Sequence, residues 1–454
     1  MRAGKRWPYF AVGLILVLGA AVGVRSRLRA RPVDPVVVHW ETVHQTIDGF
    51  GASATGYSGM FTDGQADRFF DPQKGLGLSL LRLNAIPTTV PDDCYCVSNS
   101  PGYSCVKGEK SQVLAGDLRV AQLAKERGAR IFASPWSPPA EMKSSGKFCG
   151  VGSMKSDPAL YANYAERLAD YHRLLKANGI LLEALSIQNE PDIENDGYDT
   201  CRWTGQQIHD FIPYLAEALE RNGANDVKIA APEESEWTFD LLSATAKDAA
   251  VFEKVGLILG HGYHSVKPSG LPETNGQHVW QTETSEFTKF DGSMTDGLKW
   301  AQSIHEYLTI GANAWMFWSL DCGEQFYNQA NNMCLTDQRS RLAKRAFVLG
   351  QYAKFVRPGW QRIGVSNQGG LLITAYKSPE NKFAIVVVNG TAKDARDQEF
   401  RLLGMASHSA IEPWITSASS SLERRSPLTL NATTTSFSFT IPAESVVTFV
   451  GRAD

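Results

Sequence analysis

The stretch LSIQNEP at residues 185–191 decides the fold, together with HVWQTETS at residues 278–285. Each is an apolar run that stops at a carboxylate, Glu190 in the first and Glu283 in the second. The two glutamates lie 93 positions apart (283 − 190), too far for one helix or strand to hold both. A tertiary fold has to bring them together, and the pattern of the surrounding chain predicts which fold that is.

Apolar runs alternate with helical patterns on both sides of these stretches. Eight runs are expected as strands, at residues 45–51, 77–84, 129–136, 181–188, 227–231, 255–264, 278–284 and 312–318. Helices are expected at 114–128, 157–179, 204–223, 238–254, 297–309 and 341–356. This alternation predicts a parallel sheet covered by helices, and eight units suit a (β/α)8 TIM barrel. A doubly wound open sheet is the alternative, but no glycine-rich dinucleotide fingerprint follows the first strand.

The barrel is assigned to residues 36–356. Beyond it, short strands separated by turns replace the helical patterns and predict a β-sandwich over residues 357–454. Residues 1–35 precede the fold, with Arg2, Lys5 and Arg6 placed before a charge-free stretch at 7–24. This is the layout of an export signal, and its length also allows a short membrane anchor. We therefore expect a secreted or periplasmic protein, with cleavage and membrane attachment both open.

Composition limits the partners and cofactors. A net charge of −3 gives no basic surface for nucleic acid, and a monomer is expected. Seven cysteines fit an oxidising compartment, and without a Cys-x-x-Cys pair they indicate disulfides in loops rather than a metal site. Cys322 and Cys334 are expected to pair, and the odd count leaves at least one thiol free. The other cysteines are Cys94, Cys96, Cys105, Cys149 and Cys201.

In a barrel, the active site lies at the carboxyl ends of the strands. The residues expected there are Arg82, Trp136, Asn189, Glu190, Glu233, Glu234, Tyr263, His264, Glu283 and Trp318. Glu190 and Glu283 end the fourth and seventh strands and would face each other across the mouth. Hydrolysis of a glycosidic bond needs two carboxylates that flank the bond. The pattern therefore predicts a glycoside hydrolase that needs neither a metal nor an organic cofactor.

The two carboxylates can be given different roles. Glu190 would be the acid and base, beside an Asn189 amide that could bind a sugar 2-OH. Arg82, if close to Glu283, would keep that carboxylate ionised and ready as a nucleophile. Glu286 is the competing candidate for Glu283, and a catalytically silent carbohydrate-binding barrel is the competing function. His261 and His264 are spaced to point to opposite faces of a strand, so chelation is not expected.

Four motifs in order resemble glycoside hydrolase family 30: QTIDGFG at 45–51, SPWSPP at 134–139, SIQNEP at 186–191 and WQTE at 280–283. The resemblance covers residue 39 to the end. It implies a retaining mechanism, with Glu190 as acid/base and Glu283 as nucleophile. It also implies that the strand near His39 joins the sandwich. The residues that it places in the sugar subsite are Arg82, Trp136, Asn189, Tyr263 and Trp318.

The substrate branch depends on the loops around the site. Met142 and Lys143 stand where many family members have a tryptophan, and residues 198–204 (YDTCRWT) are closer to the polysaccharide-cleaving branches. We expect xylan, β-1,6-galactan or β-1,6-glucan as substrate, with a glucosylceramidase-like lipid-sugar hydrolase as the alternative. Arg339 and Arg341 follow the eighth strand, where a surface role is expected, so no arginine is assigned to glucuronic acid.

Overall fold

The computed structural model describes residues 34–453 apart from 55–60, 86–93, 99–102, 108, 265–266, 322–330, 406–409 and 432. The side chains of residues 94–113 and 331 are not part of this description. The N-terminal segment and Cys322 lie outside the described residues, so the expected signal or anchor and the expected Cys322–Cys334 pair stay predictions. The described chain belongs to one compact unit.

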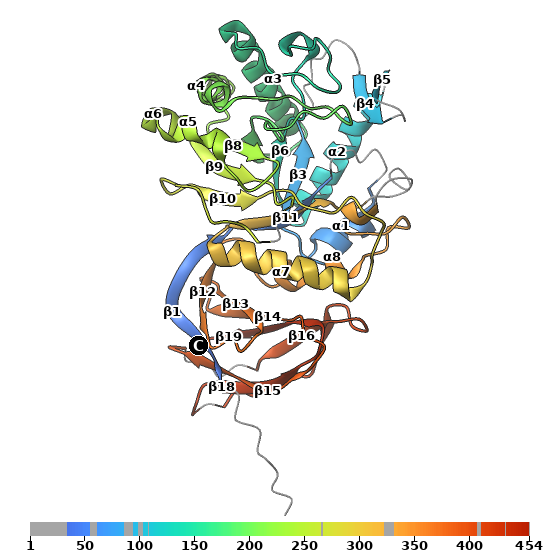
Figure 1. Ribbon diagram of the computed structural model, residues 1–454. Helices are drawn as coiled ribbons and strands as arrows, with labels where there is room; N and C mark the ends of the chain where they lie inside the picture. The colour runs from blue at the N-terminus through green and yellow to red at the C-terminus, as the bar shows by residue number, and fades with distance from the viewer. Residues whose placement is uncertain are drawn as a thin grey trace, which may run out of the picture. The chain divides into compact units, whose positions relative to one another are not determined.

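Eight parallel strands close into a barrel, which confirms the predicted fold class (Figure 1). Each strand is hydrogen-bonded to its two neighbours in parallel register. The barrel strands are β2 (Gly49–Ser53), β3 (Leu80–Asn84), β6 (Arg130–Ser134), β7 (Leu182–Ser186), β8 (Lys228–Glu234), β9 (Val255–Gly260), β10 (His278–Gln281) and β11 (Ala314–Ser319).

The interior of the barrel is filled by side chains. Leu80, Phe132, Leu257, Trp280 and Met316 belong to one buried cluster drawn from different strands. Phe132 and Trp280 meet edge to face, with ring centroids 5.6 Å apart. A barrel packed in this way is a solid core rather than a pore, so a ligand can enter at its ends but not pass through it.

Helices cover the outside of the barrel in Figure 1. They are α1 (Asp63–Phe70), α2 (Glu109–Glu126), α3 (Pro158–Ala177), α4 (Gly205–Arg221), α5 (Ser243–Ala246), α6 (Ala249–Phe252), α7 (Met294–Ile310) and α8 (Lys344–Ala353). Short 3-10 turns lie at η1 (Ala140–Met142), η2 (Asp240–Leu242) and η3 (Asn331–Met333). The Asp157 carboxylate caps α3 by accepting from two backbone N–H groups, with Pro158 next to it, as the sequence predicts.

Two expectations are corrected. The single helix over 238–254 is wrong, since η2, α5 and α6 occupy that stretch. Asp248 has extended backbone and its carboxylate accepts from the N–H groups of Ala250 and Val251, so it starts a new helix instead of continuing one. The long loop after the second strand contains an antiparallel hairpin, β4 (Cys94–Ser98) and β5 (Tyr103–Lys107).

The C-terminal domain is built on one nine-stranded sheet in the order β17-β16-β19-β14-β13-β12-β1-β15-β18. The bounds are β1 (Val36–Ile47), β12 (Trp360–Ser366), β13 (Leu372–Lys377), β14 (Lys382–Asn389), β15 (Ala395–Leu403), β16 (Glu412–Thr416), β17 (Glu423–Arg424), β18 (Ser436–Ile441) and β19 (Ser445–Arg452). The ring centroids of Phe400 on β15 and Phe449 on β19 are 5.2 Å apart, although these two strands are far apart in the strand order. The sheet therefore folds over its own core into a sandwich.

β1, the first of the described strands, lies within this C-terminal sheet. β1 pairs antiparallel with β12 and parallel with β15, and Figure 1 shows it in blue beside the orange β12. The sandwich also packs on barrel helix α8, where the Thr448 hydroxyl donates to the backbone oxygen of Gln351 at 2.8 Å. The sandwich thus contacts the helical outside of the barrel.

Three cysteines have described side chains. Cys201 is a free, buried thiol, in line with the odd count. Cys149 and Cys334 are each disulfide-bonded, and their partners are not among the described side chains. In the part of the chain that the structure describes, no helix is both long enough and apolar enough to cross a membrane.

Candidate active site

The structure brings the seven residues predicted for catalysis and for the sugar subsite to the carboxyl ends of the barrel strands. Arg82 lies on β3 and Trp318 on β11. The other five lie just beyond strand ends: Trp136 after β6, Asn189 and Glu190 after β7, Tyr263 after β9, and Glu283 after β10. The contacts described next link these side chains into one cluster.

Arg82 is the centre of the cluster, and its side chain is fully buried. Its guanidinium pairs with Glu233 at 2.9 Å and with Glu283, and it donates to the amide oxygen of Asn189 at 2.6 Å. The Trp136 ring lies 4.5 Å from the guanidinium carbon, within cation–π range. A planar five-donor group is suited to holding several acceptors at fixed angles, which an ammonium could not do.

Glu190 is held by two close donors on different loops, and the neighbouring Asn189 amide adds a longer contact of 3.5 Å. His261 Nδ1 lies 3.1 Å from one carboxylate oxygen, and the Tyr198 hydroxyl donates to the other at 2.5 Å. The backbone of Glu190 is left-handed, with φ at 47°. A non-glycine residue in this region costs about 1–3 kcal/mol and is characteristic of functional sites, where the surrounding contacts impose it.

Glu283 is held by Arg82 and by Tyr263, whose hydroxyl donates to Glu283 Oε1 at 2.8 Å. The Tyr263 ring stacks on Phe287, an exposed aromatic on the loop after β10, with centroids 5.7 Å apart. The competing glutamate, Glu286, pairs with Lys299 instead. Glu283 and not Glu286 therefore faces Glu190.

An aromatic wall lies beside the carboxylates. Trp136 follows β6 and Trp318 lies on β11, and their ring centroids are 5.8 Å apart with planes tilted by 44°. Trp318 is partly exposed, while Trp136 is buried against Arg82. Sugar rings present apolar faces, so this wall suits a carbohydrate.

His261 and Glu233 complete the cluster. The sequence placed Glu233 at the active site without giving it a role, and it did not place His261 there. His261 was expected inside a strand, opposite His264, but β9 ends at Gly260 and the alternation rule no longer applies beyond it. Glu233 is fully buried, where its carboxylate pairs with Arg82 and accepts a hydrogen bond from the Ser134 hydroxyl. Its left-handed backbone, with φ at 66°, is the strand-end feature that the sequence did not show.

The charges of the cluster are nearly balanced. Burial would lower the pKa of His261, but the surrounding carboxylates outweigh it and raise that pKa to about 10. Burial would raise the pKa of Glu233, but Arg82 and His261 lower it to about 2. Two cations therefore face three carboxylates, Glu233 and the Glu190–Glu283 pair. One further proton on the pair would neutralise the site.

The surroundings shift the pKa values of Glu190 and Glu283 in opposite directions. Burial favours a raised pKa at Glu190, but hydrogen bonds from His261 and Tyr198 outweigh it and lower that pKa. Burial raises the pKa of Glu283, and the nearby cations His261 and Arg82 offset only part of that rise, since Arg82 is shared with Glu233 and Asn189. The expectation that Arg82 keeps Glu283 ionised at neutral pH stays a prediction.

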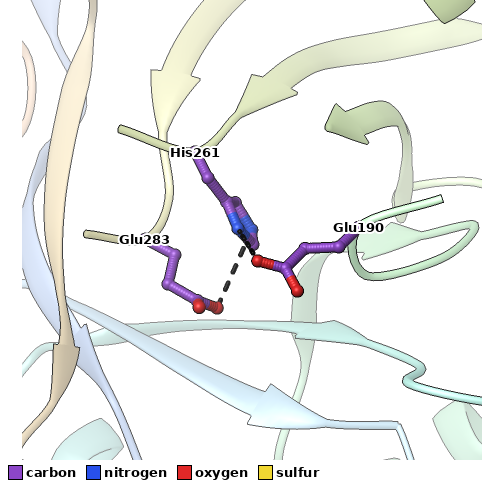
Figure 2. Close-up of side chains that lie close together, drawn as sticks. All are labelled: Glu190, His261 and Glu283. Atoms are coloured by element: carbon purple, nitrogen blue, oxygen red, sulfur yellow. Dashed lines mark hydrogen bonds and ion pairs between the residues drawn. The ribbon is translucent and has the colours of Figure 1, made fainter. Parts of the chain in front are cut away.

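Two carboxylates this close titrate as a pair, and His261 lies between them (Figure 2). Its Nδ1 is 3.1 Å from Glu190, while its Nε2 lies 3.6 Å from Glu233 and 3.7 Å from Glu283 and has no hydrogen-bond partner among the described residues. The charged ring therefore stabilises the anionic forms of these carboxylates together, and the titration of Glu190 and Glu283 belongs to the pair.

The same three side chains form the group best placed to hold a cation among the described residues. One ligand atom each from Glu190, His261 and Glu283 lies within 4.8 Å of the others. Metal coordination requires a neutral imidazole, whereas the carboxylates keep His261 protonated at neutral pH. The Arg82 guanidinium also occupies the carboxylate face that a cation would use. The donor set therefore fits a proton-transfer site better than a metal centre.

This geometry defines a class of protein. Oxygens of Glu190 and Glu283 lie within 4.8 Å of each other, close to the spacing of retaining glycoside hydrolases and well below the wider gap of inverting ones. A barrel with such a pair at its mouth, beside an aromatic wall, is a glycoside hydrolase of the retaining type.

The chain belongs to glycoside hydrolase family 30. The family's TIM-barrel domain matches residues 93–292 and its β-sandwich domain matches residues 359–449, together more than half of the chain. The protein is therefore an O-glycosyl hydrolase.

Named relatives favour the xylanases of the family. The glucuronoxylanase XynC of Bacillus subtilis (strain 168) is 28% identical over 430 residues, which cover 91% of each chain. A solved family 30 subfamily 8 xylanase from Clostridium acetobutylicum is 29% identical, with a TM-score of 0.76, and covers 92% of this chain and 99% of its own. The lysosomal acid glucosylceramidase of Mus musculus is 24% identical over 59% of this chain and 58% of its own length.

Proposed function

We propose that the protein cleaves the main chain of β-xylan by a retaining double displacement, with Glu190 as acid/base and Glu283 as nucleophile. The observation that carries this proposal is the close, buried Glu190–Glu283 pair, in which each carboxylate has its own hydrogen-bond donors. Similarity to xylanases over nearly the whole chain supports the choice of substrate.

In the first step, a carboxylate oxygen of Glu283 attacks the anomeric carbon while Glu190 gives its proton to the leaving oxygen. In the second step, Glu190 removes a proton from water, and the resulting oxygen displaces Glu283 from the sugar. Arg82 and Tyr263 hold Glu283 in line for the attack. Asn189 has its oxygen engaged by Arg82, and its NH₂ group donates to Glu190 at 3.5 Å, which leaves its second N–H to donate to the sugar 2-OH.

The substrate is proposed to be read through its neutral main chain rather than through glucuronic acid side groups. Recognition of a carboxylate calls for a cation, above all a bidentate arginine. The arginines considered for this role follow the eighth barrel strand. The segment between β11 and α8, residues 320–343, has two basic residues, Arg339 and Arg341. Both are exposed, and Arg341 is already paired with Asp337 at 2.6 Å.

We also propose export. The support is the sequence of residues 1–24, with three basic residues ahead of a charge-free stretch, and N-terminal sequencing of the mature protein tests it. Retention of Met1 in the mature chain would contradict cleavage.

The function is tested by chromatography of products from linear β-1,4-xylan, glucuronoxylan, β-1,6-galactan and β-1,6-glucan, with Glu283→Gln as the inactive control. We expect xylo-oligosaccharides from both xylans at similar rates. A ladder of products indicates internal cleavage, and a single small sugar indicates cleavage from an end. Hydrolysis of glucosylceramide without any activity on xylan would overturn the substrate assignment.

A further inference from the structure

Lys143 lies at the position where the sequence suggested a missing aromatic wall, and its side chain is completely buried. Its ammonium donates to three backbone oxygens, those of Phe148 at 2.9 Å, Gly150 at 2.9 Å and Thr200 at 2.6 Å. These bonds use all three donors of the group. Burying an ammonium is costly unless it is fully satisfied, so its presence calls for a role.

The three oxygens belong to two different loops. Phe148 and Gly150 lie on the loop between β6 and α3, and Thr200 lies on the loop between β7 and α4. The loops also pair through their backbones, since the N–H of Gly150 donates to the oxygen of Tyr198 at 3.2 Å. Lys143 is therefore a cross-link that fixes the second loop to the first.

The second loop carries Tyr198, two positions before Thr200. Its hydroxyl donates to Glu190 at 2.5 Å. A continuous path of hydrogen bonds and two peptide units thus runs from the Lys143 ammonium to the proposed acid/base carboxylate.

We propose that Lys143 is a positioning residue that sets the acid strength of Glu190 by holding Tyr198 against it. The proposal rests on the proposed role of Glu190 as acid/base. A phenol that donates to a carboxylate stabilises its anion, so withdrawal of Tyr198 makes Glu190 a weaker acid. The hydrogen bonds of Lys143 to the two loops therefore affect proton transfer by Glu190 and not the binding of the sugar.

The other side chains around both ends of this path are kept in every variant, and Lys143 lowers the pKa of both Asp199 and Cys201 against the larger effect of burial. Glu190 also faces the charged groups His261, Arg82, Glu233 and Glu283. Lys143 faces Asp199 and Cys201. Burial raises the pKa of Cys201 to about 12, so its thiol stays neutral, and burial raises that of Asp199 to about 6.

The test is a double-mutant cycle with Lys143→Met, Tyr198→Phe and the double variant, using kcat and kcat/KM on linear xylan across pH. The high-pH limb of kcat/KM reports the proton on the general acid. We expect this limb to move to higher pH in each single variant, and kcat to fall roughly tenfold, because misplacing a catalytic group has a cost of this order. KM should change little, and the double variant should match Tyr198→Phe.

Lys155→Met is the matched control. Lys155 is on the same loop but exposed, and it bonds one carbonyl, that of Glu141. It should leave the profile unchanged. If Lys143→Met does not fold, as judged by its thermal melting and near-UV circular dichroism, Lys143→Gln replaces it and keeps part of the donor set.

The outcomes separate the proposals. An unmoved limb in a folded Lys143 variant overturns the positioning role, as does a shift of equal size in the Tyr198→Phe background or an unmoved limb in Tyr198→Phe itself. A wild-type enzyme without activity on any xylan overturns the proposed function instead.

Discussion

Replacing Glu233 with glutamine removes one negative charge from a fully buried cluster and keeps the shape of the side chain. The pKa of Glu233 falls from its ordinary 4.5 to about 2 because Arg82 and His261 stabilise the anion against burial. At about 1.4 kcal/mol for each pH unit by which a pKa moves, this equals about 3 kcal/mol of stability. Breaking a buried ion pair by removing one partner costs about 3–5 kcal/mol, which is consistent. We therefore expect Glu233→Gln to lower the free energy of unfolding by about 3 kcal/mol.

The assay is guanidinium unfolding followed by tryptophan fluorescence at neutral pH, with Glu286→Gln as the matched control. Glu286 is also paired, with Lys299, but about a third of each side chain is exposed, so its loss should cost about 0–1 kcal/mol. Because the pKa of Glu233 is lowered in the fold, its contribution is present above pH 4.5 and is lost as the pH falls through 2. The gap between wild type and variant should narrow over that range. A cost at neutral pH no larger than that of Glu286→Gln would refute the charge balance described for the site.

Three further predictions concern the same mouth. Glu283→Gln should lower kcat on xylan by roughly 10³-fold or more, since it removes the proposed nucleophile. Mass spectrometry of the wild type after reaction with a 2-fluoro-xyloside should find the label on Glu283. A label on another residue would contradict the assignment. His261 has a pKa raised from 6.5 to about 10, so the stability that it contributes is complete below pH 6.5 and is lost as the pH rises through 10. The difference in unfolding free energy between wild type and His261→Asn should therefore shrink between pH 6 and pH 10, and a constant difference would argue against an imidazolium. Phe287 is 60% exposed and stacks on Tyr263, so Phe287→Ala should raise KM for xylan roughly 5-fold, or about 1 kcal/mol. The free energy of unfolding should stay within about 0.5 kcal/mol of wild type. An unchanged KM would show that Phe287 does not contact the substrate.

The barrel could be predicted because its strands are buried on both faces and so appear as continuous apolar runs. Glu190 and Glu283 could be located because each of them follows directly after such a run. The helix over 238–254 could not be excluded, since the residue that interrupts it, Asp248, acts through a side-chain cap that competes with helix continuation.

The partners of the two glutamates were harder to predict. His261 lies one residue past the end of β9, where the alternation of side chains along a strand no longer applies. Tyr198 and Lys143 lie on loops whose pairing depends on backbone hydrogen bonds, which leave no periodic trace in the sequence. The sequence thus located the Glu190–Glu283 pair, while the side chains that contact the pair needed the three-dimensional structure.

The insertion of β1 between β12 and β15 has a consequence for how the chain acquires its fold. Val37 is opposite Ser366 in the sheet, so β1 has no partner in this sheet until more than three hundred residues have followed it during synthesis. Contacts between such distant parts of a chain form slowly because their loop-closure entropy must be met first. Until then β12 and β15 each keep an open edge, which is a site for association with other chains. Deletion of β1 should therefore leave a barrel-containing protein that aggregates, with the nine-stranded sheet divided at the position that the strand would have filled.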